Sequence, residues 1–166
     1  SDVCSSDLSP NLTIMRSGEL YIPLVSGLSK IIPNANGDIV IPNRSVITID
    51  TNLDAGFLDI QGVLQCPTNT NANYEIKTDG ILVSGPNAEF RCGTANNLFS
   101  GNLNIELKGN RDLAELANAR NMDFVKMHDH GSLGIRAFIA VNEGSINIHA
   151  ASDDFSMRTR LAKTVE

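Results

Sequence analysis

Short apolar runs follow one another along most of this chain, and Gly, Pro, Asn or Asp ends each run after a few residues. The stretch GDIVIPNRSVITID, residues 37–50, is typical, because it holds several strand-like fragments and shows no helical period. Such punctuation predicts short strands joined by tight corners. The expected strands are 39–41, 46–50, 57–66, 74–77, 81–84, 88–92, 103–108, 137–141 and 145–149.

Three of these segments share an internal repeat, in which an apolar residue and a glycine corner precede two apolar residues spaced by one. The copies are IQGVLQC (60–66), VSGPNAEFRCG (83–93) and VNEGSINIHA (141–150). Because side chains alternate between the two faces of a strand, stacked copies predict two interior columns. Leu64, Phe90 and Ile146 form the first column, and Cys66, Cys92 and Ile148 form the second.

The repeat favours a mostly β fold, in which short strands form a right-handed parallel β-helix-like coil with one short α-helix. The helix is expected at 110–119, where Leu113, Leu116 and Ala117 share a face and Asp112 is a candidate N-cap. An antiparallel sandwich is the alternative, because its sequence also shows short strands and turn signals.

Charge and motifs narrow the classes of function. The net charge of −6 argues against nucleic-acid binding, which needs a basic footprint. No apolar run approaches the length of a membrane span. The sequence contains no HExxH motif, nucleophile elbow or phosphate-binding glycine loop. We therefore expect no cofactor.

The first residues, SDVCSSDL, match the translation of a DNA sequencing adapter. Residues 1–8 are therefore expected to be an artefact in a fragment assembled from metagenomic reads, and Cys4 is set aside. Residues 9–33 are weakly patterned. A single β domain is expected over 34–166, and it is expected to run into a truncated β-helix.

Several motifs, taken in order, resemble the G-eight domain family, which is named for its eight glycines. GDIVIPNRSVITID resembles its Gly-Asp opening, and LDIQGVLQC resembles its Leu-x-Ile-x-Gly-x-Leu strand pair. GILVSGPNAEFRCGT and GNLNIELKGNRD are similar to the two strand motifs that follow. The segment after residue 132 resembles the entry into a parallel β-helix, although Ala150 and Arg158 replace a usual Gly and Trp.

The resemblance implies an extracellular or cell-surface, glycan-associated module of a larger β-helix protein, with a hyaluronan-like polysaccharide as partner. Such domains occur in cell-migration-inducing and transmembrane hyaluronidases, fibrocystin-like receptors and bacterial secreted proteins. Two alternatives stay open. The chain is a fragment of a polysaccharide-degrading, hyaluronidase-like enzyme, or it is a structural stalk or adhesin segment.

Structural roles are expected for the glycines and cysteines of the repeat. The glycines assigned to corners and strand ends are Gly37, Gly62, Gly85, Gly93, Gly109 and Gly144. If Cys66 and Cys92 stack on adjacent rungs, their Cα atoms lie about 4.8 Å apart, within disulfide range. Two buried thiols in an apolar column are the alternative.

Few side chains suggest a binding site. His128 and His130 lie in MHDHG, but a zinc site needs further ligands, and a polar loop is the better interpretation. Arg158, Arg160 and Lys163 form the one basic cluster that could contact a polyanionic glycan. Catalytic residues cannot be assigned, because glycoside hydrolysis needs two carboxylates at a defined separation.

Overall fold

The computed structural model describes residues 13–14, 20–21, 24–68, 71–109 and 113–151, and the strands from residue 24 onward form three parallel sheets. The five-stranded sheet has the order β14-β11-β8-β5-β3, and the four-stranded sheet has the order β13-β10-β7-β4. The three-stranded sheet has the order β12-β9-β6. Their bounds are β3 Leu24–Gly27, β4 Ile39–Ile41, β5 Ser45–Thr48, β6 Leu53–Asp54, β7 Phe57–Ile60, β8 Val63–Gln65, β9 Asn73–Thr78, β10 Gly80–Ser84, β11 Glu89–Cys92, β12 Asn102–Leu107, β13 Phe138–Val141 and β14 Ser145–Ile148.

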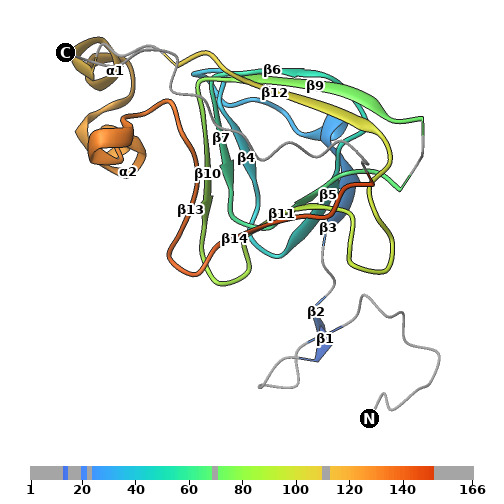
Figure 1. Ribbon diagram of the computed structural model, residues 1–166. Coiled ribbons are helices and arrows are strands. Elements are labelled where there is room, and N and C mark those ends of the chain that lie inside the picture. The colour runs from blue at the N-terminus through green and yellow to red at the C-terminus, as the bar shows by residue number, and fades with distance from the viewer. Residues whose placement is uncertain (1–12, 15–19, 22–23, 69–70, 110–112, 152–166) are drawn as a thin grey trace.

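The chain visits the three sheets in turn, so that consecutive strands belong to different sheets and each strand pairs with the one a turn later. Figure 1 shows the sheets as three sides around a common interior. Every pairing among β3–β14 is parallel, which confirms the predicted parallel strands and excludes the antiparallel sandwich for this part of the chain. Among the described strands, only β1 (Thr13–Ile14) and β2 (Leu20–Tyr21) pair antiparallel.

The interior contains the predicted column of Leu64, Phe90 and Ile146. Phe90 lies opposite Leu64 on one side and Ile146 on the other. Leu64 and Phe90 have no exposed surface, and Ile146 is half-buried. The ring of Phe90 also meets Phe138 edge to face, with centroids 5.0 Å apart. The register confirms the face assignment made from alternation in the sequence.

The second column holds the cysteines. Cys66 and Cys92 form a disulfide, their Cα atoms lie 4.7 Å apart, and Ile148 lies opposite Cys92 on the next strand. Both cysteines are buried. The bond therefore joins two successive turns of the coil through its interior.

Glycines occupy the same corner in three successive turns. Gly62 lies between β7 and β8, Gly85 between β10 and β11, and Gly144 between β13 and β14. A Cβ at Gly62 would lie 2.2 Å from the carbonyl oxygen of Pro42, and one at Gly144 would lie 2.4 Å from that of Val83. The corners at Gly62 and Gly144 therefore leave no room for a side chain, whereas Gly85 has a positive φ of 119° that favours glycine. Gly37 precedes β4, Gly93 follows β11, and Gly109 follows β12.

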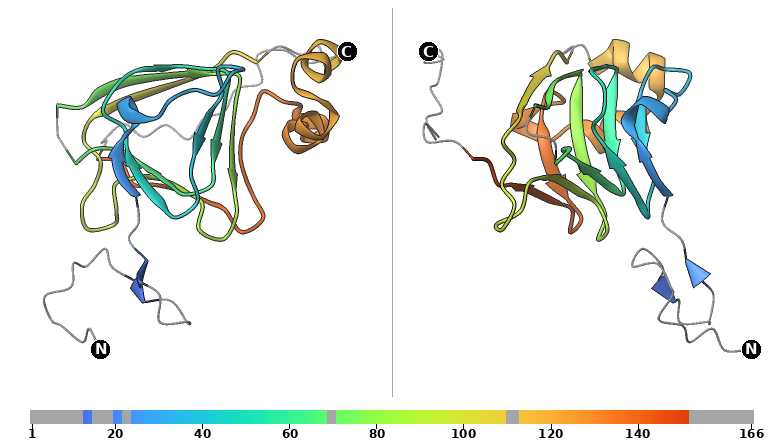
Figure 2. Two further views of the ribbon diagram at one scale, coloured as in Figure 1. Left: turned by 180° about the vertical axis from the view of Figure 1, so that it is seen from behind. Right: turned by 90° about the vertical axis from the view of Figure 1, so that its right-hand side faces the viewer.

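A helical insert separates β12 from β13. It contains α1 (Leu113–Arg120), α2 (Met122–His128) and the 3₁₀ turn η2 (Gly131–Leu133). A further 3₁₀ turn, η1 (Leu28–Lys30), follows β3. Figure 2 shows the insert outside the coil, next to the four-stranded sheet.

The helix expected at 110–119 corresponds to α1, whereas α2 was not predicted from the sequence. Residues 110–112, including the candidate cap Asp112, lie outside the described residues. The short helix α2 is capped by Asn121, whose side-chain oxygen accepts a hydrogen bond from the Phe124 amide. Its packing on the coil, not an apolar stripe of its own, stabilises it, since Met122 and Met127 are exposed.

Candidate functional site

The outward face of the five-stranded sheet carries a ladder of polar side chains that crosses four strands. Thr48, Gln65, Arg91 and Asn147 lie in register on β5, β8, β11 and β14, and Glu89 lies two residues before Arg91. They point outward because the residues between them, such as Leu64 and Phe90, fill the interior. We call Thr48, Gln65, Glu89, Arg91 and Asn147 the polar ladder.

Hydrogen bonds connect the polar ladder from one strand to the next. Gln65 Nε2 donates to Thr48 Oγ1 at 3.0 Å, and Arg91 Nη2 donates to Gln65 Oε1 at 2.8 Å. Asn147 Nδ2 donates to Glu89 Oε1 at 2.9 Å, and the other oxygen of Glu89 lies 3.4 Å from Arg91 Nη1. The contacts orient planar amide, guanidinium and carboxylate groups along one line.

Solvent reaches the two charged members of the polar ladder. The side chain of Arg91 is 35% exposed and that of Glu89 is 23% exposed. A guanidinium has five N–H donors, so Arg91 keeps donors for a ligand beyond those that Gln65 and Glu89 engage. The two charges cancel, and the polar ladder therefore offers hydrogen-bonding groups without a strong field of either sign.

The outward face of the three-stranded sheet carries more charged side chains, and these are also paired with one another. Lys77 Nζ lies 3.4 Å from Glu75 and 3.7 Å from Glu106, and Lys108 contacts Asp54. The interaction with Glu75 raises the pKa of Lys77, and the hydrogen bond from Lys108 lowers the pKa of Asp54. This exposed face is a suitable internal control for the polar ladder.

The helical insert covers part of the third outward face, that of the four-stranded sheet, and Arg120 anchors it. Arg120 Nε donates to Asp38 Oδ2 at 3.0 Å, and Arg120 Nη2 donates to Asp38 Oδ1 at 2.9 Å. Asp38 Oδ1 also accepts the amide of Phe57 at 2.9 Å. The hydrogen bonds to Asp38 raise the pKa of Arg120. The guanidinium of Arg120 is charged at all ordinary pH values.

A second buried pair joins α2 to the same sheet. His128 Nε2 lies 2.6 Å from Asp59 Oδ1, and the side chains are only 2% and 11% exposed. The His128 ring stacks on Phe124 and tilts against Phe57, with centroids 3.9 and 4.7 Å apart. Phe57 forms a small apolar cluster with Leu116, Val125 and Ile135. The insert is therefore held by apolar contact and two polar pairs.

Comparison with known proteins places this architecture in a family. The sequence model of the G8 domain family matches residues 26–162. This range includes all the parallel strands from the end of β3 onward and the helical insert. The chain belongs to the G8 domain family. No curated protein and no solved structure matches it.

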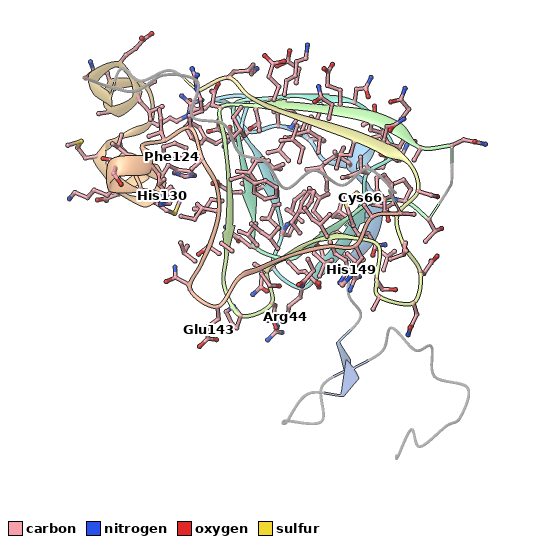
Figure 3. All side chains as sticks on the ribbon, viewed as in Figure 1. Arg44, Cys66, Phe124, His130, Glu143 and His149 are labelled. Atoms are coloured by element: carbon pink, nitrogen blue, oxygen red, sulfur yellow. A yellow bond between two sulfur atoms is a disulfide. The ribbon has the colours of Figure 1, made fainter. Side chains whose placement is uncertain are left out.

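In this G8 domain, His128 and His130, the two weak candidates for metal ligands, are otherwise engaged or apart. His128 Nδ1 lies 2.8 Å from the carbonyl oxygen of Phe124, so both of its nitrogens face protein oxygens. His130 lies on the insert in Figure 3, away from Cys66 in the coil interior. Within the described ranges, no group of three or more His, Cys, Asp or Glu residues is placed to hold a metal ion.

The basic cluster of Arg158, Arg160 and Lys163 lies outside the described residues, as do residues 1–8. The described part of the chain contains no helix with the length and apolar character needed to cross a bilayer.

Sequence reasoning missed the residues that dock the insert. Asp38 and Arg120 are 82 positions apart, and Asp59 and His128 are 69 apart, so no local pattern links them. One signal was available in FLDI, residues 57–60, where a large aromatic residue and an acid share the outward face of a strand. All four residues of this strand are buried, which requires a cover on that face.

Proposed function

We propose that this G8 domain is an extracellular, glycan-associated module that contacts a hyaluronan-like polysaccharide through the polar ladder. The observation that carries the proposal is the continuous line of donors and acceptors from Thr48 to Asn147 on a sheet face that solvent reaches. Neighbouring strands are about 4.8 Å apart, so these groups recur at a regular spacing. A polymer with repeating hydroxyl, amide and carboxylate groups suits such a line.

In this proposal, Arg91 gives the polar ladder its specificity for a sugar that carries a carboxylate. Its guanidinium can donate paired hydrogen bonds to a sugar carboxylate, and Gln65 and Asn147 can hydrogen-bond hydroxyl or amide groups beside it. The net charge of −6 opposes a polyanion, so binding is weak and depends on salt.

An extracellular location is supported by two observations. The chain belongs to the G8 domain family, and the bond between Cys66 and Cys92 persists best in an oxidising compartment. The same compartment contains polysaccharides such as hyaluronan.

We further propose that the sheets continue a right-handed parallel β-helix in a larger protein. The inward side chains of Phe138, Ala140 and Ile146 are only half-buried, and Ile148 is 53% exposed. Each earlier turn is buried by the turn that follows it, as Phe90 buries Leu64. A further turn of strands would bury the last described turn in the same way.

Titration of the full chain with hyaluronan oligosaccharides at low salt tests the proposed function. Arg91→Ala removes the guanidinium and is expected to weaken binding by about tenfold or more, since hydrogen bonds to charged groups contribute about 1.5–3 kcal/mol. Gln65→Ala is expected to weaken it less. Lys77→Ala, on the three-stranded sheet, is the matched control and should bind as the parent does.

Equal affinities for Arg91→Ala and Lys77→Ala would refute the polar ladder as the binding face. Absence of binding by the parent chain to hyaluronan and to neutral glycans would favour a structural stalk. Circular dichroism of each variant shows whether the sheets are intact, so that loss of binding is not confused with unfolding.

A further inference from the structure

The environment of His128 defines where its protons are. Nδ1 lies 2.8 Å from the carbonyl oxygen of Phe124, and a carbonyl oxygen can only accept, so Nδ1 carries a proton. Nε2 lies 2.6 Å from a carboxylate oxygen of Asp59. Two bare acceptors at that distance would repel each other, so a second proton lies between Nε2 and Oδ1.

Burial strengthens this conclusion. The His128 side chain is 2% exposed and that of Asp59 is 11% exposed. If the shared proton were missing, a water molecule could not readily enter to hydrogen-bond the two acceptors. Either the imidazolium faces a carboxylate, or a neutral imidazole accepts from a carboxylic acid. Both arrangements contain the same number of protons, and the inference does not depend on which of the two atoms holds the shared one.

We propose that the Asp59–His128 pair is a proton-dependent latch that holds the helical insert against the four-stranded sheet and loosens as the pH rises. Loss of the shared proton leaves a buried carboxylate facing the lone pair of an imidazole, which destabilises the docked insert. The proposal is independent of glycan binding, because the polar ladder lies on a different sheet.

Other charged groups lie near the latch, on α1 and just after α2. On α1, Arg120 lies over the rings of Phe57 and Phe124, which also contact His128, but its charge is constant and Asp38 pairs with it. After α2, burial lowers the pKa of His130, the neighbouring His128 lowers it further, and Asp129 opposes this. The pKa of His130 therefore lies below that of a free histidine.

The direction of the pH effect follows from the proton counts. When the insert opens, His128 faces water, where a histidine side chain loses its proton near pH 6.5 or so. Above that pH the open form binds about one proton fewer than the closed form, so opening becomes more favourable as the pH rises. Below that pH, down to about pH 4 where a free Asp begins to protonate, both forms bind the same number and the latch is fully closed.

Opening would expose a defined surface. The insert covers Phe57 and Asp59, and a hollow of about 130 Å³ beside Met127 already reaches Asp59, Gln61 and Ser84. Arg120 on α1 keeps its charge and its hydrogen bonds to Asp38 hold that helix, so the expected change is local undocking of α2, with the coil intact.

Hydrogen exchange of the full chain tests the latch. The amides of α2 are followed between about pH 7 and pH 9, and their rates are corrected for the intrinsic effect of pH. Release of one proton on opening predicts that protection falls about tenfold per pH unit, while amides of β8 and β11 change little. His128→Gln keeps an amide donor for Asp59 without a titrating group, and its α2 protection should not vary with pH. His149→Gln, at an exposed histidine, is the control and should keep the slope of the parent chain.

A flat pH profile in the parent chain, or the same slope in His128→Gln, would overturn the proposal. Nitrogen NMR of the His128 ring is a second, independent measurement on the unmodified chain. Two directly bonded protons on the ring, or one on Nδ1 with a protonated Asp59 carboxyl, support the latch. A neutral ring beside an ionised Asp59 in the docked state would refute it, even if His128→Gln failed to fold.

Discussion

Replacing Phe90 by alanine removes one of the largest fully buried side chains in the coil. Phe90 has no exposed surface, and its strand is paired on both sides, so the neighbours Leu64 and Ile146 cannot close the gap easily. Phe→Ala substitutions in packed cores cost about 3–5 kcal/mol, and the edge-to-face contact with Phe138 is lost as well. We expect a loss of about 4 kcal/mol in the free energy of unfolding.

Urea denaturation followed by far-ultraviolet circular dichroism measures this loss. For a chain of this size, about 4 kcal/mol corresponds to a fall in melting temperature of roughly 8–16 °C. The urea dependence of the unfolding free energy should stay the same, since the coil unfolds to the same extent. Leu98→Ala is the control, because this leucine is 49% exposed and its loss should change stability by less than about 0.5 kcal/mol. Similar losses for the two variants would show that Phe90 does not fill the interior as described.

Four further predictions concern the disulfide, a corner, the insert and catalysis. Replacing both Cys66 and Cys92 by alanine should lower the free energy of unfolding by roughly 3–4 kcal/mol, as expected for a closed loop of 26 residues. Thiol titration of the unfolded parent chain should detect two fewer free thiols before reduction than after it. Gly62→Ala should destabilise by more than about 2 kcal/mol in the same urea assay, because its Cβ would meet a backbone oxygen; a neutral effect would contradict the corner geometry. Arg120→Ala leaves Asp38 buried without the guanidinium that pairs with it. It should lower the free energy of unfolding by about 3 kcal/mol and speed hydrogen exchange of the insert amides. Lys77→Ala, at an exposed pair, should leave both stability and exchange unchanged. Incubation with hyaluronan should leave the polymer length constant over time, whereas depolymerisation that is lost on mutating a single Asp, Glu or His would establish the enzyme hypothesis.

The interior columns could be predicted because they depend on local order along the chain. Alternation decides which residues of a strand point inward, and the repeated glycine corner aligns one copy with the next. Leu64, Phe90 and Ile146 therefore met in the structure as the sequence indicated. The repeat also brought Cys66 and Cys92 to equivalent positions, although the sequence could not distinguish a bond from two thiols.

The second helix of the insert, α2, and the docking of the insert on the coil could not be predicted in the same way, because the contacts that hold them are not local. The short helix α2 has little intrinsic tendency to form, and packing against Phe57 and Asp59 supplies its stability. The polar ladder was missed for a related reason. Outward positions such as Gln65 and Arg91 are recognisable, but only the register of neighbouring strands shows that they form one line.

The bond between Cys66 and Cys92 also determines how the coil would respond to mechanical tension. A chain pulled from its ends would unfold one turn at a time, since each turn is held mainly by its neighbours. The bond closes a loop across 26 positions of the sequence, and this segment cannot be extended while the bond is intact. The fully extended loop would span roughly 90 Å. The maximum extension of the oxidised chain is therefore shorter than that of the reduced chain by about this length. In a protein tethered at a cell surface, the disulfide would act as a stop that keeps the central turns wound under load.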